Sequence, residues 1–378
     1  MVLNETQRMV RESARQFARE QVAPYARDWE RAGAFPAATL AAMGELGFLG
    51  MTVPETLGGA GLDYVSYALA LMEVAGGDGA LSTLMSVQNA PVCAILVGEA
   101  SPAQQARFLP DLASGAMIGA FALTEPQAGS DAAQLRLRAR RVPGGYRLDG
   151  TKQFITSGAI AGVVITFAVT EPTAGKRGIS AFLVPAGSPG LRVAALERKT
   201  GQRASDTAQL AYDDVFVPDE LRLGAEGEGY RIALANLEAG RIGIAAQCVG
   251  MARAALDHAL AYARERQAFG QPLSAHQAMR FRLADMATEV EAGEQLVLAA
   301  AAARDAGLPC LQQACMAKLF AAEMAERVCS AAVQVFGGYG YVEDYPVEKI
   351  WRDVRVCQIY EGTSDVQRML VARQLLGG

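Results

Sequence analysis

The C-terminal part of the chain contains three long, alanine-rich stretches with a helical pattern, and they constrain the fold more than any other feature of the sequence. A shorter helical stretch begins near Ser364, after the three long ones, which are Tyr230–Arg266, Ala275–Ala306 and Pro309–Phe336. Long helices joined by short connections pack as an antiparallel bundle. The sequence therefore predicts a C-terminal helical bundle over residues 228–378.

The middle of the chain, residues 118–227, has the pattern of a β domain. Leu135, Leu137 and Ala139 alternate with arginines, as a half-buried strand does. Further short apolar runs, separated by proline and glycine, are Val163–Val169, Ile179–Val184, Leu191–Val193 and Leu210–Val217. Short strands at this spacing favour a barrel or a sandwich.

The first part of the chain, residues 1–117, is expected to be helical. Asn4 and Gln7 have the spacing of a capping box at the start of the first helix, and Pro24 is expected to stop or bend that helix. A glycine-rich turn follows at Gly58–Gly61. The chain is therefore predicted to be an α+β protein of three domains, with boundaries at about residues 117 and 227.

Composition and charge exclude several classes of protein. Hydrophobic residues make up 51% and charged residues 20%, which predicts a folded chain with a large core. The net charge of −5 argues against general nucleic-acid binding, which needs a basic surface. The most apolar run, Val163–Val169, is far shorter than the ~18 residues of a membrane span, so no membrane is expected. The N-terminus lacks the apolar stretch of a secretory signal.

Cysteine and histidine are too few and too scattered for a metal centre. None of the six cysteines forms a CxxC pair, and only two histidines are present, so no metal site is expected. The cysteines are interpreted as small core residues of a protein in a reducing compartment. Sequence motifs for phosphate-binding loops, zinc proteases and serine hydrolases are also missing.

Two segments at the start of the β domain have ligand-binding character. In Phe121–Asp131, Gly129 lets the backbone approach a ligand closely, and Thr124 and Ser130 offer hydroxyls. In Gly150–Gly158, the aromatic residue at 154 and the hydroxyl at 156 are expected on one side of a strand, where they suit the face and edge of a planar ring. Taken alone, both segments also fit an ordinary turn and a strand with one buried aromatic residue.

Two segments of the helical part are further candidates for a functional role. Gln334–Tyr341 ends a long helix, and its glycines also fit a simple helix C-cap. Arg264–Gly270 places Arg266 near a helix end, where a guanidinium can hold a pyrophosphate, although a solvated charged face is the alternative. His276 follows shortly after and is interpreted as a packed or supporting residue.

The segment Ile359–Arg368 contains a candidate general base. Ser364 and Gln367 have the spacing of a capping box, so Glu361 is expected just before the N-terminus of the last helix. Tyr360 and the apolar residue before it would partly desolvate the carboxylate and raise its pKa, which suits a base. The alternative is a solvated glutamate stabilised by the helix dipole.

Together, in this order and spacing, the segments resemble the acyl-CoA dehydrogenase family over essentially the whole chain. Pro54–Leu62 and Lys199–Ser205 also look like segments of that family. The resemblance implies an N-terminal helical domain, a middle β-barrel domain and a C-terminal four-helix bundle. It also implies FAD as cofactor and a homotetramer built as a dimer of dimers, with part of the cofactor bound by a neighbouring subunit.

The resemblance further implies roles for individual residues. Glu361 matches the catalytic base. Some members carry the base directly before Arg241, but this position is Gly240, which cannot serve. The implied acyl-CoA contacts are Ser130, Glu238, Ala239, Gly240, Arg241, Tyr360, Gly362 and Arg373. The implied FAD contacts are Phe121, Leu123, Thr124, Gly129, Ser130, Phe154, Ile155, Thr156, Arg266, Phe269, Gln277, Gln334, Val335, Phe336, Gly337, Gly338, Thr363, Ser364 and Asp365.

The implied reaction is the α,β-dehydrogenation of an acyl-CoA thioester to the trans-2-enoyl-CoA. Glu361 would take the α-proton while a hydride leaves to the flavin, and an electron-transfer flavoprotein would collect the electrons. The stretch Leu237–Ala245 looks most like short-chain members, and Ser82 stands where glutaryl-accepting relatives carry an arginine. Fatty acid β-oxidation in the cytoplasm is expected, or in the mitochondrial matrix if a transit peptide has been removed.

Two other functions are compatible with the same resemblance. Relatives act as flavin-dependent oxidases or monooxygenases on substrates without CoA, but the presence of Glu361 and Arg241 argues for CoA substrates. One branch of the family is a flavin-containing DNA-protecting protein with a basic extension. The net charge of −5 argues against that branch.

Overall fold

The computed structural model describes residues 1–377. The helices of the N-terminal part are α1 (Glu5–Phe17), α2 (Ala26–Ala32), α3 (Ala37–Glu45), α4 (Tyr64–Gly77), α5 (Gly79–Val87), α6 (Ala94–Glu99) and α7 (Pro102–Ser114). The predicted capping box is present, because Asn4 Oδ1 accepts the N–H of Gln7 at 2.8 Å and Gln7 Oε1 accepts the N–H of Asn4 at 3.0 Å. A π-helical turn ends at Val22, just before Pro24, and α2 then starts anew.

The middle part forms one hydrogen-bonded sheet. Its strands are β1 (Gly119–Ala122), β2 (Arg138–Val142), β3 (Gly145–Thr156), β4 (Val163–Val169), β5 (Ile179–Pro185), β6 (Leu191–Leu196), β7 (Thr207–Pro218) and β8 (Arg222–Leu223). They lie in the order β6-β7-β3-β2-β4-β5-β8, with β1 paired to β4. Thr166 on β4 and Tyr212 on β7 share a hydrogen bond of 2.8 Å although these strands are not neighbours, so the sheet curls round its own core.

The predicted strand around Leu135–Ala139 is shorter than expected. Regular pairing starts only at Arg138, because the backbone N–H groups of Arg136 and Leu137 donate to the carboxylate of Glu125 at 2.7 and 3.0 Å. Glu125 also accepts from the fully buried Lys152 at 2.8 Å. A carboxylate at the end of β1 thus takes the place of a neighbouring strand.

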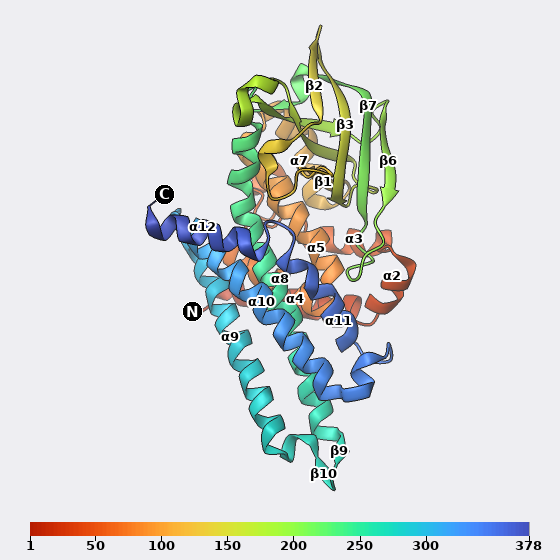
Figure 1. The fold of residues 1–378 in the computed structure, drawn as a ribbon, viewed down its shortest axis with the longest axis vertical. Coiled ribbons are helices and arrows are strands. Elements are labelled where there is room, and N and C mark those ends of the chain that lie inside the picture. Colours follow the sequence, from red (N-terminus) through yellow and green to blue (C-terminus); the bar gives the residue numbers. More distant parts are fainter. Residues whose placement is uncertain (378) are drawn as a thin grey trace.

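The C-terminal part consists of three long helices and two shorter ones within the described residues. They are α8 (Gly229–Glu265), α9 (Gln277–Asp305), α10 (Leu311–Phe336), α11 (Val347–Val354) and α12 (Ser364–Leu376). A small hairpin, β9 (Gln267–Ala268) with β10 (Gln271–Pro272), joins α8 to α9 at the end of the molecule opposite the sheet (Figure 1). The predicted long helices are confirmed, and α12 lies across them rather than alongside (Figure 1).

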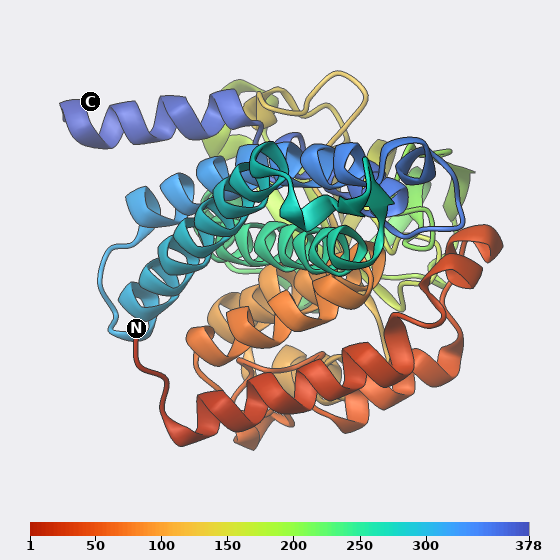
Figure 2. The same cartoon turned by 90° about the horizontal axis from the view of Figure 1, so that it is seen from below.

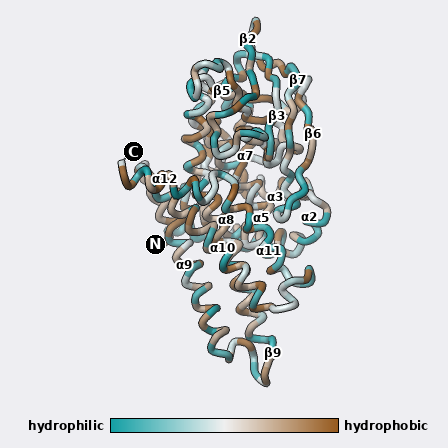
Figure 3. The backbone as a smooth tube through the Cα atoms, in the orientation of Figure 1, coloured by the Kyte–Doolittle hydropathy of each residue, from teal (hydrophilic) through white to brown (hydrophobic). Residues whose placement is uncertain are grey.

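Two apolar cores hold these parts together. The larger core is shared by the N-terminal and C-terminal helices, since Tyr67 and Leu71 of α4 belong to the same cluster as Ile244 of α8 and Met324 of α10. The second core fills the sheet and includes residues of α7 such as Leu109. Figure 2 shows α8 between the N-terminal helices and the remaining C-terminal helices, and Figure 3 shows apolar residues along these contacts. Residues on α8 therefore face several elements at once.

All six cysteines are buried and unpaired, as predicted for core residues. Val163–Val169 was named from the sequence as the most apolar run, and the helical stretch Gly79–Glu99 was overlooked. By length and composition alone, this stretch is apolar enough to cross a membrane. In the structure, 83% of its apolar window is buried inside the protein itself. Its apolar residues are therefore accounted for by the protein core.

Candidate active site

Glu361 lies in the loop between α11 and α12, in a left-handed backbone conformation (φ 51°) that is rare for a residue with a side chain. Its Oε2 atom is shielded from solvent and has no hydrogen-bond partner among the described residues. Burial raises the pKa of this carboxyl to about 7, and the positive charges of Lys318 and Arg241 oppose the rise. A buried, unpartnered carboxylate that titrates near neutrality is suited to accept a proton from a weak carbon acid.

The backbone beside Glu361 is fixed by two polar side chains that the sequence did not single out. Lys318 Nζ donates to the carbonyl oxygen of Gly362 at 2.7 Å, and Gln367 Nε2 donates to the same oxygen at 2.9 Å. Gln367 Nε2 also lies 3.3 Å from the carbonyl oxygen of Glu361. The only sequence signal for Lys318 was a lone charge in the apolar run 314–322, and in the structure its side chain is completely buried.

The predicted cap of α12 is displaced by one residue. The N-cap is Thr363, whose hydroxyl accepts the N–H of Val366 at 3.3 Å, and Ser364 is the first helical residue. Gln367 does not close a capping box, because its side chain turns back to the carbonyls beside Glu361. Glu361 therefore precedes the cap by two residues, and its carboxylate is not part of the helix end.

Helix α8 passes directly beside the carboxylate. A Cβ built on Gly240 would lie 2.0 Å from Glu361 Oε2, so a glycine is needed there for the carboxylate to keep its position. The next residue, Arg241, is 6% exposed, and its Nε is buried without a partner among the described residues. Gly240 and Arg241, two of the predicted substrate contacts, thus lie close to Glu361, the predicted base.

Other predicted substrate contacts lie elsewhere. Glu238 Oε1 accepts from Cys310 Sγ at 3.0 Å and from Arg304 at 3.4 Å, so this carboxylate is engaged at the junction of α9 and α10. Ala239 is buried within α8, and Arg373 belongs to the last turn of α12. The hydroxyl of Tyr360 donates to Gln247 at 3.2 Å, inside the protein.

The predicted flavin contacts of the β part come together. The N–H of Gln153 donates to the carbonyl oxygen of Thr124 at 2.9 Å, and Lys152 Nζ donates to that of Leu123 at 2.8 Å, so the segment after β1 lies against β3. At this point β3 has a bulge, where Phe154 adopts φ 58° and exposes 61% of its surface. An exposed aromatic ring beside an open backbone segment is suited to a planar ligand.

The remaining members of this group differ in exposure. Leu123 and Ile155 are buried, Phe121 and Thr156 are half-buried, and Gly129 and Ser130 are exposed. The Phe121 ring packs against Phe167, with centroids 5.1 Å apart. A Cβ on Gly129 would meet nothing within 4 Å, which leaves free space beside this backbone.

The predicted FAD contacts of the C-terminal part lie around a depression of about 630 Å³ at the opposite end of the bundle. Arg266 and the end of α10, from Gln334 to Gly338, line it together with aromatic residues such as Tyr339, whose ring lies 5.5 Å from the Arg266 guanidinium. Gly337 and Gly338 leave open space where side chains would stand. The structure thus brings Arg266 and the segment Gln334–Gly338 into one site.

The other two members of this group lie on the neighbouring hairpin. Phe269 is 97% exposed at its tip, and Gln277 is the first residue of α9. Between them, His276 Nε2 is 3.0 Å from the carbonyl oxygen of Ala268, which fits the packed role predicted for this histidine.

The two flavin-related groups are far apart within one chain. Arg266 follows the C-terminal end of α8, whereas the N-terminal end packs on the sheet, where the N–H of Gly227 donates to Ser180 at 2.9 Å (Figure 1). The 37 residues of α8 correspond to about 55 Å at 1.5 Å per residue. Within one copy of the chain, the Arg266 depression therefore lies at the end of the molecule opposite the sheet (Figure 1).

No cluster of metal-ligating side chains is present in residues 1–377. The candidate site consists of a buried carboxylate, an exposed aromatic ring beside an open backbone segment, and an arginine-lined depression. A buried carboxylate suits proton transfer, and the other two features suit a planar ligand and an anion.

Comparisons with known proteins identify the family. Models of the acyl-CoA dehydrogenase N-terminal, middle and C-terminal domains match residues 4–116, 120–215 and 227–376. An acyl-CoA dehydrogenase of Bacillus subtilis (strain 168) is 47% identical over 378 residues, which is the full length of both chains. The short-chain specific acyl-CoA dehydrogenase of Bos taurus mitochondria is 43% identical over 374 residues, or 99% of this chain and 91% of that protein.

Solved structures give the same result. Butyryl-CoA dehydrogenase from Megasphaera elsdenii matches with a TM-score of 0.96 and 39% identity, covering 100% of this chain and 99% of the other. A chain from a structure of the electron transferring flavoprotein of Acidaminococcus fermentans matches with a TM-score of 0.98 and 41% identity over both full lengths. A glutaryl-CoA dehydrogenase from Mycobacterium smegmatis in complex with FADH2 matches with a TM-score of 0.95, 33% identity and coverage of 100% and 96%.

The chain belongs to the acyl-CoA dehydrogenase family. It is an oxidoreductase with acyl-CoA dehydrogenase activity, as the sequence had indicated, and the predicted order of a helical, a β and a second helical domain is confirmed.

Proposed function

We propose that the protein converts short acyl-CoA thioesters to trans-2-enoyl-CoA with Glu361 as the base. The observation that carries this proposal is the Glu361 carboxylate, whose Oε2 is buried without a partner and whose pKa is raised to about 7. An α-proton beside a thioester is weakly acidic, so its removal needs a desolvated base and a stabilised enolate. No hydrogen bond within residues 1–377 uses the Glu361 backbone N–H, which leaves this group free to donate to the thioester oxygen.

FAD is the proposed cofactor, and the residues present fit it. Phe154 offers an exposed ring beside the open backbone at Gly129, and the Arg266 depression offers a charge for a pyrophosphate. When bound, FAD supplies the acceptor for the hydride that leaves the β-carbon. Because the depression lies at the end of the molecule opposite the sheet (Figure 1), it would serve the cofactor of a neighbouring copy in the homotetramer that the family resemblance implies. Thr363, Ser364 and Asp365 at the start of α12 remain predicted cofactor contacts.

The proposed substrates are short monocarboxylic acyl groups, straight or singly branched. No lysine or arginine occurs between residues 81 and 96, and Ser82 is fully buried with its hydroxyl bonded to Gly79 and Gln247. An unpaired distal carboxylate would cost several kcal/mol to bury there. About one turn after Gly240 on the same face of α8, the space beside the helix is filled by Ser86 and Tyr67. A Cβ on Gly243 would lie 2.6 Å from Ser86 Oγ and 2.7 Å from the Tyr67 hydroxyl. This closure supports a short acyl pocket.

An electron-transfer flavoprotein is the proposed electron acceptor. The family assignment supports it, as does the match to a chain from the Acidaminococcus fermentans structure. Reoxidation of the substrate-reduced protein by a purified electron-transfer flavoprotein, compared with reoxidation by oxygen, tests this partner. Fast reoxidation by oxygen alone would favour the oxidase alternative.

The decisive experiment combines Glu361→Gln with a substrate panel. The glutamine keeps the size of the side chain but cannot accept a proton, so the variant should bind flavin and lose at least 99% of the bleaching rate with butyryl-CoA. Retention of more than a tenth of the wild-type rate would assign the base to another residue. In the wild type, C4 to C8 esters and isobutyryl-CoA should bleach the flavin fastest. Comparable turnover of glutaryl-CoA, or an optimum at C14 or longer, would refute the substrate class.

A further inference from the structure

Three buried polar side chains and the half-buried Tyr360 form a closed ring of hydrogen bonds beside Glu361. The hydroxyl of Tyr360 donates to Gln247 Oε1 at 3.2 Å, and Gln247 Nε2 donates to Thr83 Oγ1 at 2.8 Å. Thr83 Oγ1 donates to Gln202 Oε1 at 2.7 Å, and Gln202 Nε2 returns to the Tyr360 hydroxyl at 3.5 Å. Each member donates to the next, and three members also have partners outside the ring, namely Thr83 with Gly79, Gln247 with Ser82 and Tyr360 with Cys357.

The members of this ring come from all three domains. Thr83 lies on α5 of the N-terminal part, Gln202 on the loop before β7, and Gln247 on α8. Tyr360 precedes Glu361 directly. Through this ring, the position of the loop that carries Glu361 is linked to the contacts between the three domains.

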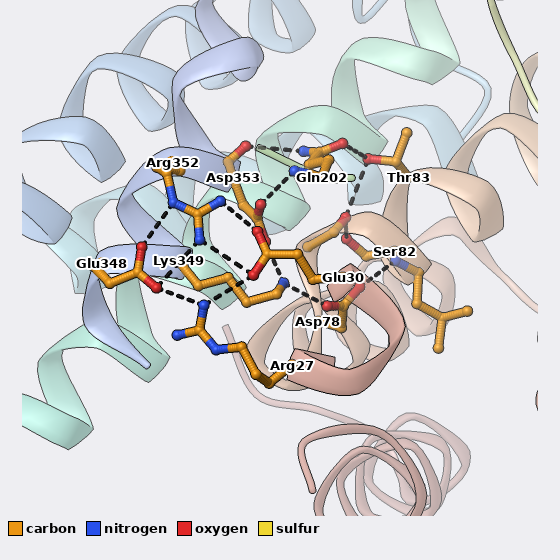
Figure 4. Close-up of polar contacts among 12 residues, drawn as sticks. Arg27, Glu30, Asp78, Ser82, Thr83, Gln202, Glu348, Lys349, Arg352 and Asp353 are labelled. Atoms are coloured by element: carbon orange, nitrogen blue, oxygen red, sulfur yellow. Dashed lines mark hydrogen bonds and ion pairs between the residues drawn. The ribbon is translucent and has the colours of Figure 1, made fainter. Parts of the chain in front are cut away.

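Gln202 is the member that is held most firmly. Its backbone has φ 50°, a left-handed conformation, and its side chain is 3% exposed. Its N–H donates to the Asp353 carboxylate, and its Nε2 donates to the Asp353 carbonyl oxygen at 3.0 Å. Figure 4 shows Gln202 between Asp353 and Thr83. A strained, buried residue that is fixed by several partners is a feature of functional sites.

A buried ion cluster fixes the partner of Gln202 in turn. Lys349 Nζ donates to Asp353 at 2.6 Å and to Asp78 at 2.7 Å, which joins α11 to the start of α5 (Figure 4). Arg352, beside Asp353, reaches the carbonyl oxygen of Thr200 at 3.1 Å. The loop that carries Gln202 is thus clamped by two neighbouring residues of α11.

We propose that Gln202 is a positioning residue for the catalytic base, which it orients through the hydroxyl of Tyr360. The inference rests on the proposed function, in which Glu361 is the base. Glu361 has no hydrogen bond of its own at Oε2, so its place is set by its neighbours. Gly362 is held on one side by Lys318, and Tyr360 is held on the other side by the ring. The backbone is thus held on both sides of Glu361, while its Oε2 remains free to accept a proton.

The test uses Tyr360→Phe, Gln202→Asn and the double variant of the flavin-loaded protein. Tyr360→Phe removes only the hydroxyl, and Gln202→Asn keeps the amide and tolerates the left-handed backbone but is too short to reach Tyr360. Misplacing a reacting group by about 1 Å costs about a hundredfold in rate. Each variant should lower kcat ten- to a hundredfold and change KM less than threefold. The kcat of the double variant should be no lower than that of the less active single variant, because both changes break the same hydrogen bond.

Two readouts separate positioning from a general loss of stability. The pH at which kcat/KM falls to half on the acid side should move down by about one unit as Glu361 becomes more solvated, because burial is the larger of the effects that set its pKa. Amide hydrogen exchange in residues 357–363 should become faster. Tyr212→Phe is the matched control, because it deletes a buried tyrosine hydroxyl bonded to Thr166 at 2.8 Å and lies outside the ring. Tyr212→Phe should change kcat and the amide exchange rates of residues 357–363 less than twofold, and it should leave the pH midpoint of kcat/KM where it is in the wild type.

The outcomes are distinct for the inference and for the proposed function. If Glu361→Gln is inactive but Tyr360→Phe and Gln202→Asn behave as Tyr212→Phe does, the positioning role is wrong and the base stands. Multiplied losses in the double variant would also refute it. If Glu361→Gln is active, the proposed function fails first. Should Gln202→Asn not fold, Tyr360→Phe alone decides the question.

Discussion

Gly240→Ala is the change that tests the geometry of the base most directly. The added Cβ would lie 2.0 Å from Glu361 Oε2 and 2.9 Å from the carboxyl carbon. Ordinary contact between such atoms begins near 3.4 Å, so the carboxylate must retreat by about 1.4 Å. The obstructing atom is the far end of a flexible side chain, so the fold itself need not change. The expected damage is therefore to catalysis rather than to stability.

The size of the effect follows from that displacement. A misplacement of about 1 Å costs roughly a hundredfold, so kcat with butyryl-CoA should fall by about this factor, equivalent to about 2.7 kcal/mol of activation free energy. The assay is single-turnover bleaching of the flavin, with thermal unfolding measured in parallel. The matched control is Gly98→Ala on α6, where a Cβ would meet nothing within 4 Å. This control should keep full activity.

Two results would refute the reasoning. An activity of Gly240→Ala within threefold of the wild type would mean that the carboxylate does not work from the position beside α8. A loss of stability much larger than that of the control, with the same rate per folded molecule, would mean that the backbone moves rather than the carboxylate. In either case the close approach of Gly240 to Glu361 would not define the reacting geometry.

Four further predictions follow from charges and contacts. The base must be ionised, so kcat/KM should rise with pH and reach half its maximum near pH 7, the pKa of Glu361, and a midpoint near 4.5 would contradict its burial. Because that pKa is raised in the folded state, Glu361→Gln should gain thermal stability over the wild type as pH rises from about 4.5 to 7, with no gain at pH 4. Lys152→Met leaves the Glu125 carboxylate buried and should lower the free energy of unfolding by about 3 kcal/mol in urea denaturation. Arg266→Ala should lower FAD content at purification, whereas Arg264→Ala, an exposed neighbour on the same helix, should not.

Much of the fold was predictable because its signals are local. The long helices follow from residue periodicity, and the cap at Asn4 follows from a four-residue pattern. The strand near Leu135 was only partly predictable, because the carboxylate that shortens it, Glu125, depends on a long-range pair with Lys152. Alternation of apolar residues cannot reveal which partner takes a backbone N–H.

The candidate site also contains residues with a local sequence signal and residues that only long-range contacts reveal. Glu361 became a candidate through a local pattern, a carboxylate beside apolar residues and a helix start, and the family resemblance made it the predicted base; the cap itself was misplaced by one residue. The ring of Thr83, Gln202, Gln247 and Tyr360 has no local pattern, since its members lie up to 277 positions apart and each looks like an ordinary polar residue.

Backbone strain connects the predicted and the unpredicted residues. Glu361, Phe154 and Phe269, all named from the sequence, adopt positive φ in the structure, and so does Gln202, which was not named. Such conformations cost of order 1 kcal/mol or more each and persist only where several contacts enforce them. At Gln202 those contacts are hydrogen bonds to Asp353, Thr83 and Tyr360. The same hydrogen bonds therefore hold Gln202 in its strained conformation and hold Tyr360 beside Glu361. A change that lets the Gln202 backbone relax should also make the position of Glu361 less well defined.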